Sequence, residues 1–306
     1  MSIQFLADGL IAGATIGLAA IGVTLTYSIL GFANFAHGEF ISWGCYLTWG
    51  LAAVIGALLP ASAEVIGALS VGWNVVLACL VAMFITGAMA VALDAILFRP
   101  LRKRGASITA VIASFGASMA LRALLEAVVP SRQAYLSSDI PIAIPLLKGL
   151  RVTPDQMVLL AAAGVLAGLL QLLITRTHIG RSMRAVSENQ ALARVAGIDV
   201  ARVIRVTWFI GGALACAAGG ILGLVVQIRP SMGADLLLPL FAAAILGGVG
   251  SVPGALVGGL IVGLAEAAAV QWWGAQWRAA VAFVIVIAVL QLRPSGLFGA
   301  RAGGSA

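Results

Sequence analysis

Charged side chains are scarce in this chain of 306 residues, where Asp, Glu, Lys and Arg together account for 9% and hydrophobic residues for 62%. So little polar surface cannot cover a water-soluble globule of this size. The mean hydropathy of +1.10 also excludes a soluble domain. We therefore predict an all-α, polytopic membrane protein that forms a single transmembrane domain over residues 1–306.

Residues that perform catalysis or bind metals are also few. The histidines and cysteines are widely separated and lack metal-ligand spacing: His37, His178, Cys45, Cys79 and Cys216. The chain has no HExxH or GxSxG motif, and no glycine-rich phosphate loop precedes its lysines, Lys103 and Lys148. We expect no enzyme, no metal site and no cofactor bound by this chain, so any ATP must bind to partner subunits.

Long apolar stretches are what the chain has in abundance. A helical span needs about 20 apolar residues. The candidates are residues 6–30, 40–59, 75–97, 108–129, 156–174, 206–228, 236–249, 254–270 and 279–292. We predict eight or nine crossings. The uncertainty lies at 236–270, where GGVGSVPG separates two arms that both look short for a span, as broken or re-entrant helices do.

Arginines indicate the orientation of these spans. Ten of the eighteen basic residues lie in two runs, 99–104 and 176–205, beside apolar stretches. This is the positive-inside pattern, so we read the net charge of +7 as a membrane signal and expect no nucleic acid partner. Both runs should be cytoplasmic and the loop 130–153 external. Arg293 and Arg301 return to the cytoplasm only if 236–249 and 254–270 cross as a hairpin of two spans, and the N-terminus is then outside.

Glycines recur at every fourth position in several stretches. The phased residues are Gly9, Gly13, Gly17, Gly164, Gly168, Gly219, Gly223, Gly250, Gly254, Gly258, Gly259 and Gly263. In a membrane, small residues at this spacing let helix backbones approach closely. We expect helices to pack closely at these positions. The thin interfaces could also let one helix slide along another.

Residues 176–205, here called the polar island, interrupt the apolar pattern. We predict a helix from Arg181 to Ala196 whose apolar stripe combines Val186, Leu192, Val195 and Ala196. Gly197 ends this helix, Ile198 packs back on its last turn, and Asp199 caps the next helix. Such a segment is either an amphipathic connector on the lipid headgroups or a coupling helix that inserts into a cytoplasmic partner.

Two glycine-containing interruptions lie in opposite halves of the chain. The first is FANFAHGEF, with Asn34, His37, Gly38 and Glu39. The second contains Gly247, Gly248, Gly250, Ser251, Pro253 and Gly254. Their polar groups either stabilise helix breaks or line the path of a transported solute. Paired breaks in two halves also suggest an inverted repeat.

Ionisable residues inside apolar stretches are candidates for function, because they are costly at membrane depth. Arg122 and Glu126 are four residues apart and should form an ion pair on one helix face. Asp94 should lie beside Arg99. Glu266, close to the second break, is the candidate to bind a substrate ammonium group.

Four blocks of the sequence resemble one known family. GRSMRAVSENQALARVAGID, GLAAIGVTLTYSILGFANFAHGEFISWGCYL, ILGGVGSVPGALVGGLIVGLAE and LQLRPSGLFG are similar to segments of the branched-chain amino acid permeases, on the LivH side of the LivH/LivM family. The resemblance implies a multi-pass protein of the bacterial inner membrane in an ATP-binding-cassette importer. Its partners would be two ATPase subunits, a LivM-like second permease, an extracytoplasmic binding protein and membrane lipid.

The same resemblance implies that the polar island couples the chain to the ATPases. The residues expected to do so are Arg181, Arg184, Glu188, Ala193, Gly197, Ile198 and Asp199. The alternative function is an ion-coupled secondary transporter or a channel for small polar solutes, which would use the buried carboxylates as ion sites. The exact substrate stays open among branched-chain amino acids, other amino acids, amides and urea.

Overall fold

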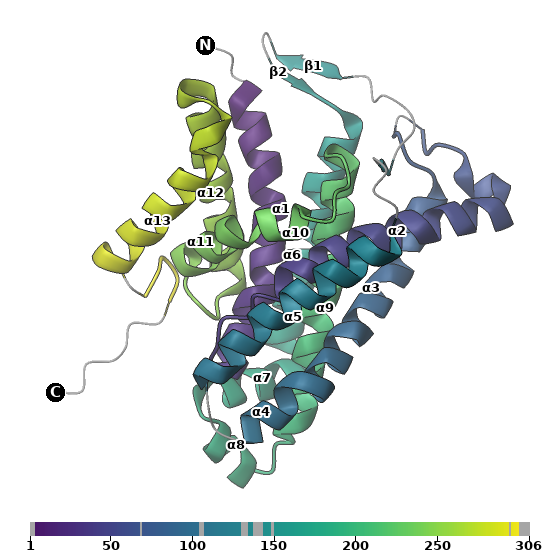
Figure 1. Ribbon diagram of the computed structural model, residues 1–306. Helices are drawn as coiled ribbons and strands as arrows, with labels where there is room; N and C mark the ends of the chain where they lie inside the picture. Colours follow the sequence, from purple (N-terminus) through teal and green to yellow (C-terminus); the bar gives the residue numbers. More distant parts are fainter. Residues whose placement is uncertain are drawn as a thin grey trace. The chain divides into compact units, whose positions relative to one another are not determined.

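The computed structural model describes residues 4–67, 69–103, 107–129, 134–136, 143–147, 150–293 and 295–299. Its long helices are α1 (Gln4–Leu30), α2 (His37–Leu58), α3 (Trp73–Leu93), α5 (Ser107–Val128), α6 (Pro154–Arg176), α9 (Val200–Val225), α12 (Val252–Trp273) and α13 (Arg278–Leu292). The shorter ones are α4 (Arg99–Lys103), α7 (His178–Glu188), α8 (Gln190–Val195), α10 (Met232–Asp235) and α11 (Leu237–Gly247). Strands β1 (Ile144–Leu147) and β2 (Leu150–Val152) pair antiparallel (Figure 1). In this part of the chain, eight helices are long and apolar enough to cross a membrane, which confirms the all-α, polytopic prediction.

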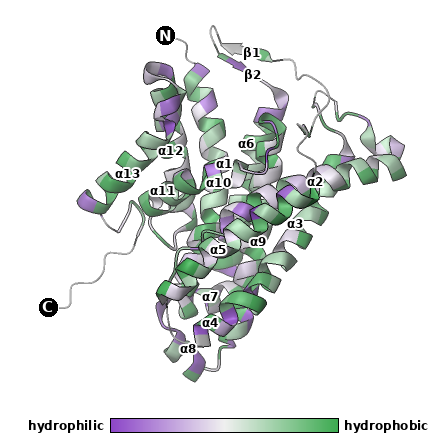
Figure 2. Ribbon diagram, viewed as in Figure 1, coloured by the Kyte–Doolittle hydropathy of each residue, from purple (hydrophilic) through white to green (hydrophobic). Residues whose placement is uncertain are grey.

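The helices group into two compact units. Unit 1 contains Met1–Gly31, Ala162–Ile204 and Leu238–Ala306, and unit 2 contains Phe32–Ala161 and Arg205–Leu237. Both units combine segments that are remote in sequence, and the chain passes between them at the first predicted break. Hydrophobic residues run along α3 and α13, whereas polar residues gather on α8 (Figure 2). The single-domain prediction for residues 1–306 stays a prediction.

Unit 1 is built on a close pair of antiparallel helices, α1 and α12. Their backbones approach so closely that a Cβ added at Gly9 would lie 2.9 Å from the Cα of Leu264. One added at Gly13 would lie 2.7 Å from the Cα of Leu260. This confirms the predicted glycine packing for α1 and for its partner positions on α12. The van der Waals contact between backbones is what small residues provide in place of a hydrophobic drive.

The glycines of α6 behave differently. Among the described residues, no atom lies within 4 Å of the position that a Cβ would take at Gly164 or Gly168. The prediction that these two glycines pack against another helix of the chain is therefore wrong. Spacing alone cannot distinguish a packed glycine from one on an outer face, because both have the same period.

Unit 2 is organised around α2. The indole N–H of Trp43 donates to the carbonyl of Leu121 on α5 at 3.0 Å. On another side, the Ser42 hydroxyl donates to the carbonyl of Pro230 at 3.0 Å and accepts from the amide of Gly233 at 3.0 Å. These bonds join α2 to α5 and to the start of α10. They satisfy polar groups that the apolar surroundings would otherwise leave unpaired.

The helices around the second break differ from the prediction in length. The second arm extends to Trp273, so that α12 has 22 residues and is long enough to span. The expectation that both arms are short is wrong for this one. The first arm, α11, has only 11 residues. The chain after α13 returns to the end of α11, where the amide of Leu297 donates to the carbonyl of Leu246 at 2.8 Å.

The return of the chain after α13 shows which segments lie at the same end of unit 1. The segment after Arg293 lies beside the second break, and the break lies beside the end of α1 that is tied to the polar island, as described below. Arg293 and the island therefore share one end of unit 1, although α11 with its 11 residues is not one of the helices long enough to span. That this end is the cytoplasmic one stays a prediction from the positive-inside bias. Arg301, Lys148 and half of the loop 130–153 lie outside the described residues.

Candidate functional site

The polar island folds as two short helices where one was predicted. Helix α7 ends at Glu188, and Asn189 has an extended backbone with φ −156°. Its side-chain oxygen accepts from the amides of Ala191 and Leu192 at 2.9 and 3.0 Å, and this caps α8. Asparagine is among the strongest N-cap residues, and this was the signal that could have divided the predicted helix at Asn189.

The predicted end of the island helix is confirmed. Gly197 has φ +82°, and its amide donates to the carbonyl of Arg194 at 3.0 Å. The amide of Ile198 donates to the carbonyl of Ala193 at 3.0 Å. These two bonds define a Schellman stop. Asp199 then accepts from the amide of Arg202 at 3.0 Å and caps α9, as predicted.

The apolar stripe of the island is not continuous. Val186 is 1% exposed, whereas Leu192 is 67% and Val195 is 87% exposed. The predicted shared stripe is wrong because the break at Asn189 turns α8 away from the direction of α7. Ala193, a predicted coupling residue, is buried at 3% and cannot touch a partner through its side chain.

The charged coupling candidates lie on the surface, and one of them also has an internal partner. Arg181, Arg184 and Glu188 are all exposed on α7. The Arg184 guanidinium donates to the carbonyl of Ile174, near the end of α6, at 3.0 Å. Arg184 therefore fastens α7 to the span before it, a role that its position in the sequence did not reveal.

A second fastening joins the island to α1. The side-chain amide of Gln190 donates to the carbonyl of Ile29 at 2.6 Å, within unit 1. Helix α7 also packs against α1. Because Ile29 is one of the last residues of α1, its carbonyl has no partner within the helix and is free to accept. Sequence reasoning missed Gln190, since a polar residue in a polar loop gives no sign of a partner 161 positions away.

The first break is confirmed between α1 and α2. Gly31 ends α1 with φ +72°, a conformation that favours glycine. The side-chain oxygen of Asn34 accepts from the amide of Ala36 at 3.1 Å, which supports its role in stabilising a helix break. Gly38, expected to have an irregular backbone, lies instead in the first turn of α2. A Cβ there would lie 2.6 Å from the carbonyl oxygen of Gly233.

Two polar side chains of the first break are buried in unit 2. His37 is 1% exposed, with its ring edge toward Phe40. Glu39 is fully buried and accepts from the Ser118 hydroxyl at 3.1 Å and from Arg122 at 3.4 Å. The predicted pair of Arg122 with Glu126 is therefore wrong. The i to i+4 geometry permits that pair. An unpaired carboxylate is much more destabilising when it is buried than when it is exposed, so Arg122 pairs with Glu39.

Asp94 also has a different partner from the one expected. It lies in a π-helical segment, Asp94–Phe98, that continues α3 into α4. Both oxygens of its buried carboxylate accept from the Arg102 guanidinium, one of them at 3.0 Å. The wide turn of the π-helix shifts the register of the following residues. This places Arg102, and not Arg99, beside Asp94.

The second break is held from two sides within unit 1. Gly248 and Gly250 have φ +96° and +90°, and Ser251 caps α12 by accepting from the amide of Gly254 at 3.1 Å. The amide of Gly250 donates to the hydroxyl of Thr24 on α1 at 2.8 Å. On the other side, the amide of Phe298 donates to the carbonyl of Gly247, a helical residue of α11, at 3.0 Å. Pro253 stands at the start of α12, where its missing N–H costs nothing.

Glu266 does not belong to the second break. It lies 14 residues beyond Val252, about 21 Å along α12 at the usual helical rise. It faces Arg278 at the opposite end of unit 1, with 3.7 Å between the Arg278 Nε and a carboxylate oxygen. The placement of Glu266 near a break is therefore wrong. Among the described residues, no three His, Cys, Asp or Glu side chains are arranged to hold a metal ion.

Spanning helices, two glycine-rich breaks and a folded polar island define a multi-pass membrane transport subunit. The chain belongs to the family described as branched-chain amino acid transport system / permease component, whose model matches residues 5–290. It is thus a permease component of an ATP-binding-cassette transporter in the bacterial inner membrane.

Three relatives cover nearly the whole chain. The high-affinity branched-chain amino acid transport system permease protein BraD of Pseudomonas aeruginosa is 33% identical over 97% of this chain and 95% of its own length. The corresponding LivH of Escherichia coli is 32% identical with the same coverage. A probable LivH of Methanocaldococcus jannaschii is 29% identical over 92% of this chain and 88% of its own.

Proposed function

We propose that this chain forms part of the path by which branched-chain amino acids enter the cell. It works with two ATPase subunits that bind ATP, a second permease subunit and an extracytoplasmic binding protein that delivers the substrate. The names of the relatives support the substrate class, and the sequence, which has no phosphate-binding loop, supports ATP binding on other subunits.

The observation that carries this proposal is the structure of the polar island. Leu192 and Val195 point outward from α8 at 67% and 87% exposure, so their side chains are available to a partner. Arg181 and Glu188 are exposed on the neighbouring α7. Two apolar side chains beside charged residues form a small docking surface of the kind that a cleft on an ATPase can cover.

The island is also fastened well enough to transmit a displacement. Gln190 and Arg184 hold it to the ends of α1 and α6, and Asp199 starts α9 directly after it. Helix α1 in turn holds the second break through Thr24 and Gly250. Movement of the island therefore moves α1, and α1 moves the break.

The two breaks are the proposed lining of the path. Each combines a short uncoiled stretch with the ends of the adjoining helices, and few of its residues are charged: Asn34, His37, Gly38 and Glu39 in the first, and Gly247, Gly248, Gly250, Ser251, Pro253 and Gly254 in the second. Irregular backbone at membrane depth is tolerated where it lines a cavity or is buried in protein. A weakly polar path of this kind binds an aliphatic amino acid loosely, so specificity rests with the binding protein.

The proposal is tested by Leu192→Asp, with Leu192→Met as the matched control. We expect the aspartate variant to insert normally but to lose both co-purification of the ATPases and uptake of labelled leucine. The methionine variant should keep both, because it preserves an apolar side chain of similar volume. Full uptake by Leu192→Asp would contradict the docking surface. Uptake that follows an ion gradient without any ATPase would contradict the ATP-driven function and indicate a secondary transporter or channel.

A further inference from the structure

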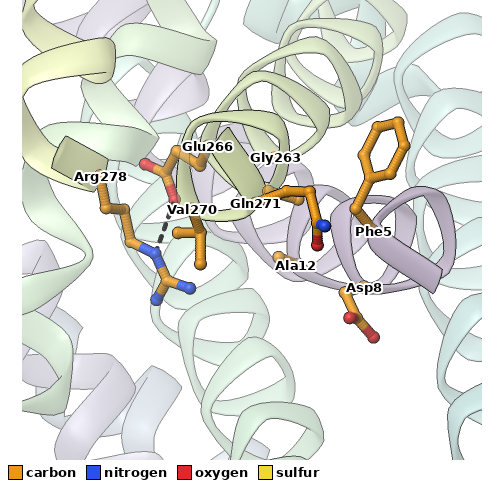
Figure 3. A pocket seen from close by; sticks show the side chains of 9 residues that line it. Phe5, Asp8, Ala12, Gly263, Glu266, Val270, Gln271 and Arg278 are labelled. Carbon is orange, nitrogen blue, oxygen red and sulfur yellow. Dashed lines mark ion pairs between the residues drawn. The ribbon is translucent and has the colours of Figure 1, made fainter. Parts of the chain in front are cut away.

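A cavity of about 260 Å³ opens at the end of unit 1 remote from the polar island. Phe5 and Asp8 come from the first turns of α1, Glu266 from the far half of α12, and Arg278 from the start of α13 (Figure 3). Glu266 and Arg278 meet on one side of this cavity, and Phe5 and Asp8 lie on the other. Within unit 1, Glu266 lies about 21 Å along α12 from Val252, so the cavity is separate from the second break.

Glu266 differs from a typical buried carboxylate because one of its oxygens lacks a hydrogen bond in the described part of the chain. Its side chain is only 6% exposed, and the 3.7 Å between its carboxylate and Arg278 is too long for a hydrogen bond. Within the described residues, its other oxygen, Oε1, is buried and has no hydrogen-bond partner. A buried acceptor without a donor is costly, so this oxygen is suited to receive a donor from a ligand.

The other charges specify the ligand further. Asp8 is exposed and adds a second carboxylate, whereas Arg278 is 60% exposed and supplies one cation at the rim. Two carboxylates and one guanidinium favour a ligand that carries both an ammonium group and an anionic group. Arginine suits an anionic oxygen cluster such as phosphate, which it can contact through two N–H groups.

The surroundings place the cavity at the depth of lipid headgroups. Three tryptophans flank Gln271 and Arg278 in sequence and are exposed: Trp272 at 57%, Trp273 at 63% and Trp277 at 51%. Exposed tryptophan is characteristic of the interface between lipid and water. Since the island is predicted to mark the cytoplasmic end of unit 1, this interface is the outer one.

We propose that the cavity binds the headgroup of phosphatidylethanolamine from the outer leaflet. The primary ammonium donates to Glu266 Oε1 and to Asp8, and the phosphate accepts from Arg278. Phosphatidylcholine has no N–H to donate, and phosphatidylglycerol has no cation. The site therefore selects the primary amine over both.

The test is native mass spectrometry of the full chain with phosphatidylethanolamine, phosphatidylcholine and phosphatidylglycerol of identical acyl chains. We expect phosphatidylethanolamine to bind about tenfold or more tightly than phosphatidylcholine, the effect of one charge-assisted hydrogen bond. Equal binding of the two would overturn the proposal. Displacement of the bound lipid by free leucine would also overturn it and make the cavity a substrate site.

Substitutions test the contacts to the ammonium and to the phosphate separately. Glu266→Gln and Asp8→Asn should reduce the preference for the primary amine, and the exposed Asp8 can change without affecting folding. Arg278→Gln should weaken both zwitterionic lipids equally and leave their ratio unchanged. The matched control is Glu64→Gln, which removes an exposed carboxylate from unit 2 and should change nothing. An unchanged preference in Asp8→Asn and Glu266→Gln together would refute the assignment of the ammonium.

Discussion

Replacement of Gly13 by alanine tests the close packing of α1 on α12 most directly. The added Cβ would lie 2.7 Å from the Cα of Leu260 and 2.9 Å from the carbonyl oxygen of Gly259. Both are backbone atoms, so no side chain can rotate away to make room. To reach 3.4 Å, where ordinary van der Waals contact begins, the Leu260 backbone has to retreat by about 0.7 Å.

The size of the effect follows from a comparison with Gly116 on α5, where no atom of the described part of the chain lies within 4 Å of an added Cβ. Alanine gains about 1 kcal/mol of helix propensity at either position, so this contribution cancels between the two variants. What remains is the cost of overpacking, typically about 1–3 kcal/mol. We expect Gly13→Ala to be less stable than Gly116→Ala by that amount.

Reversible unfolding of both purified variants in mixed micelles, followed by circular dichroism, measures this difference. Leucine uptake by the same variants shows whether the packed helices must also be in place for transport. Equal free energies of unfolding for the two variants would refute the argument. They would mean that α1 and α12 can separate without cost, so that the close approach does not hold unit 1 together.

Three further changes have defined outcomes. Gly197→Pro cannot adopt φ +82° and removes the N–H of the Schellman stop, so uptake should fall to background while the chain still inserts normally. Arg122→Met should lower the free energy of unfolding by about 3 kcal/mol, because it leaves the buried Glu39 carboxylate without its cation, and adding Glu39→Gln should recover most of the loss. Thr24→Val should cost only about 1 kcal/mol but slow uptake, since it removes the bond between α1 and Gly250.

Each of these has a result that would count against it. Normal uptake by Gly197→Pro would mean that the end of α8 is not needed for coupling. Failure of Glu39→Gln to rescue Arg122→Met would show that the arginine stabilises unit 2 by packing. Uptake at the unmodified rate in Thr24→Val would show that α1 does not carry movement to the second break.

The spans, the breaks and the local stop at Gly197 could be predicted because each depends on neighbouring residues. Hydropathy over about 20 positions marks a span whatever it packs against. A Schellman stop needs only a glycine, an apolar residue after it and the preceding helix. The start of α9 could be predicted for the same reason, because the cap at Asp199 involves only residues of the same turn.

Partners from distant parts of the chain could not be predicted in this way. Arg122 has Glu126 within reach on its own helix, and only the fold shows that Glu39 is the buried carboxylate that needs it. The bonds from Gln190 to Ile29 and from Thr24 to Gly250 join segments 161 and 226 positions apart. No pattern in a single sequence indicates such a pair, although both hydrogen bonds are central to the proposed coupling.

The α1–α12 pairing has a consequence for how the protein is made. Helix α1 leaves the ribosome before α12, yet the glycine face it must cover belongs to that helix, which begins at Val252, 222 positions after Leu30. At roughly 5–20 residues per second, α1 waits about 10–45 s for that partner. Throughout this time α1 faces lipid or the insertion machinery. A nascent chain stopped before α12 would thus expose a face that quality-control proteases can recognise, so assembly of unit 1 reports that α12 has been made.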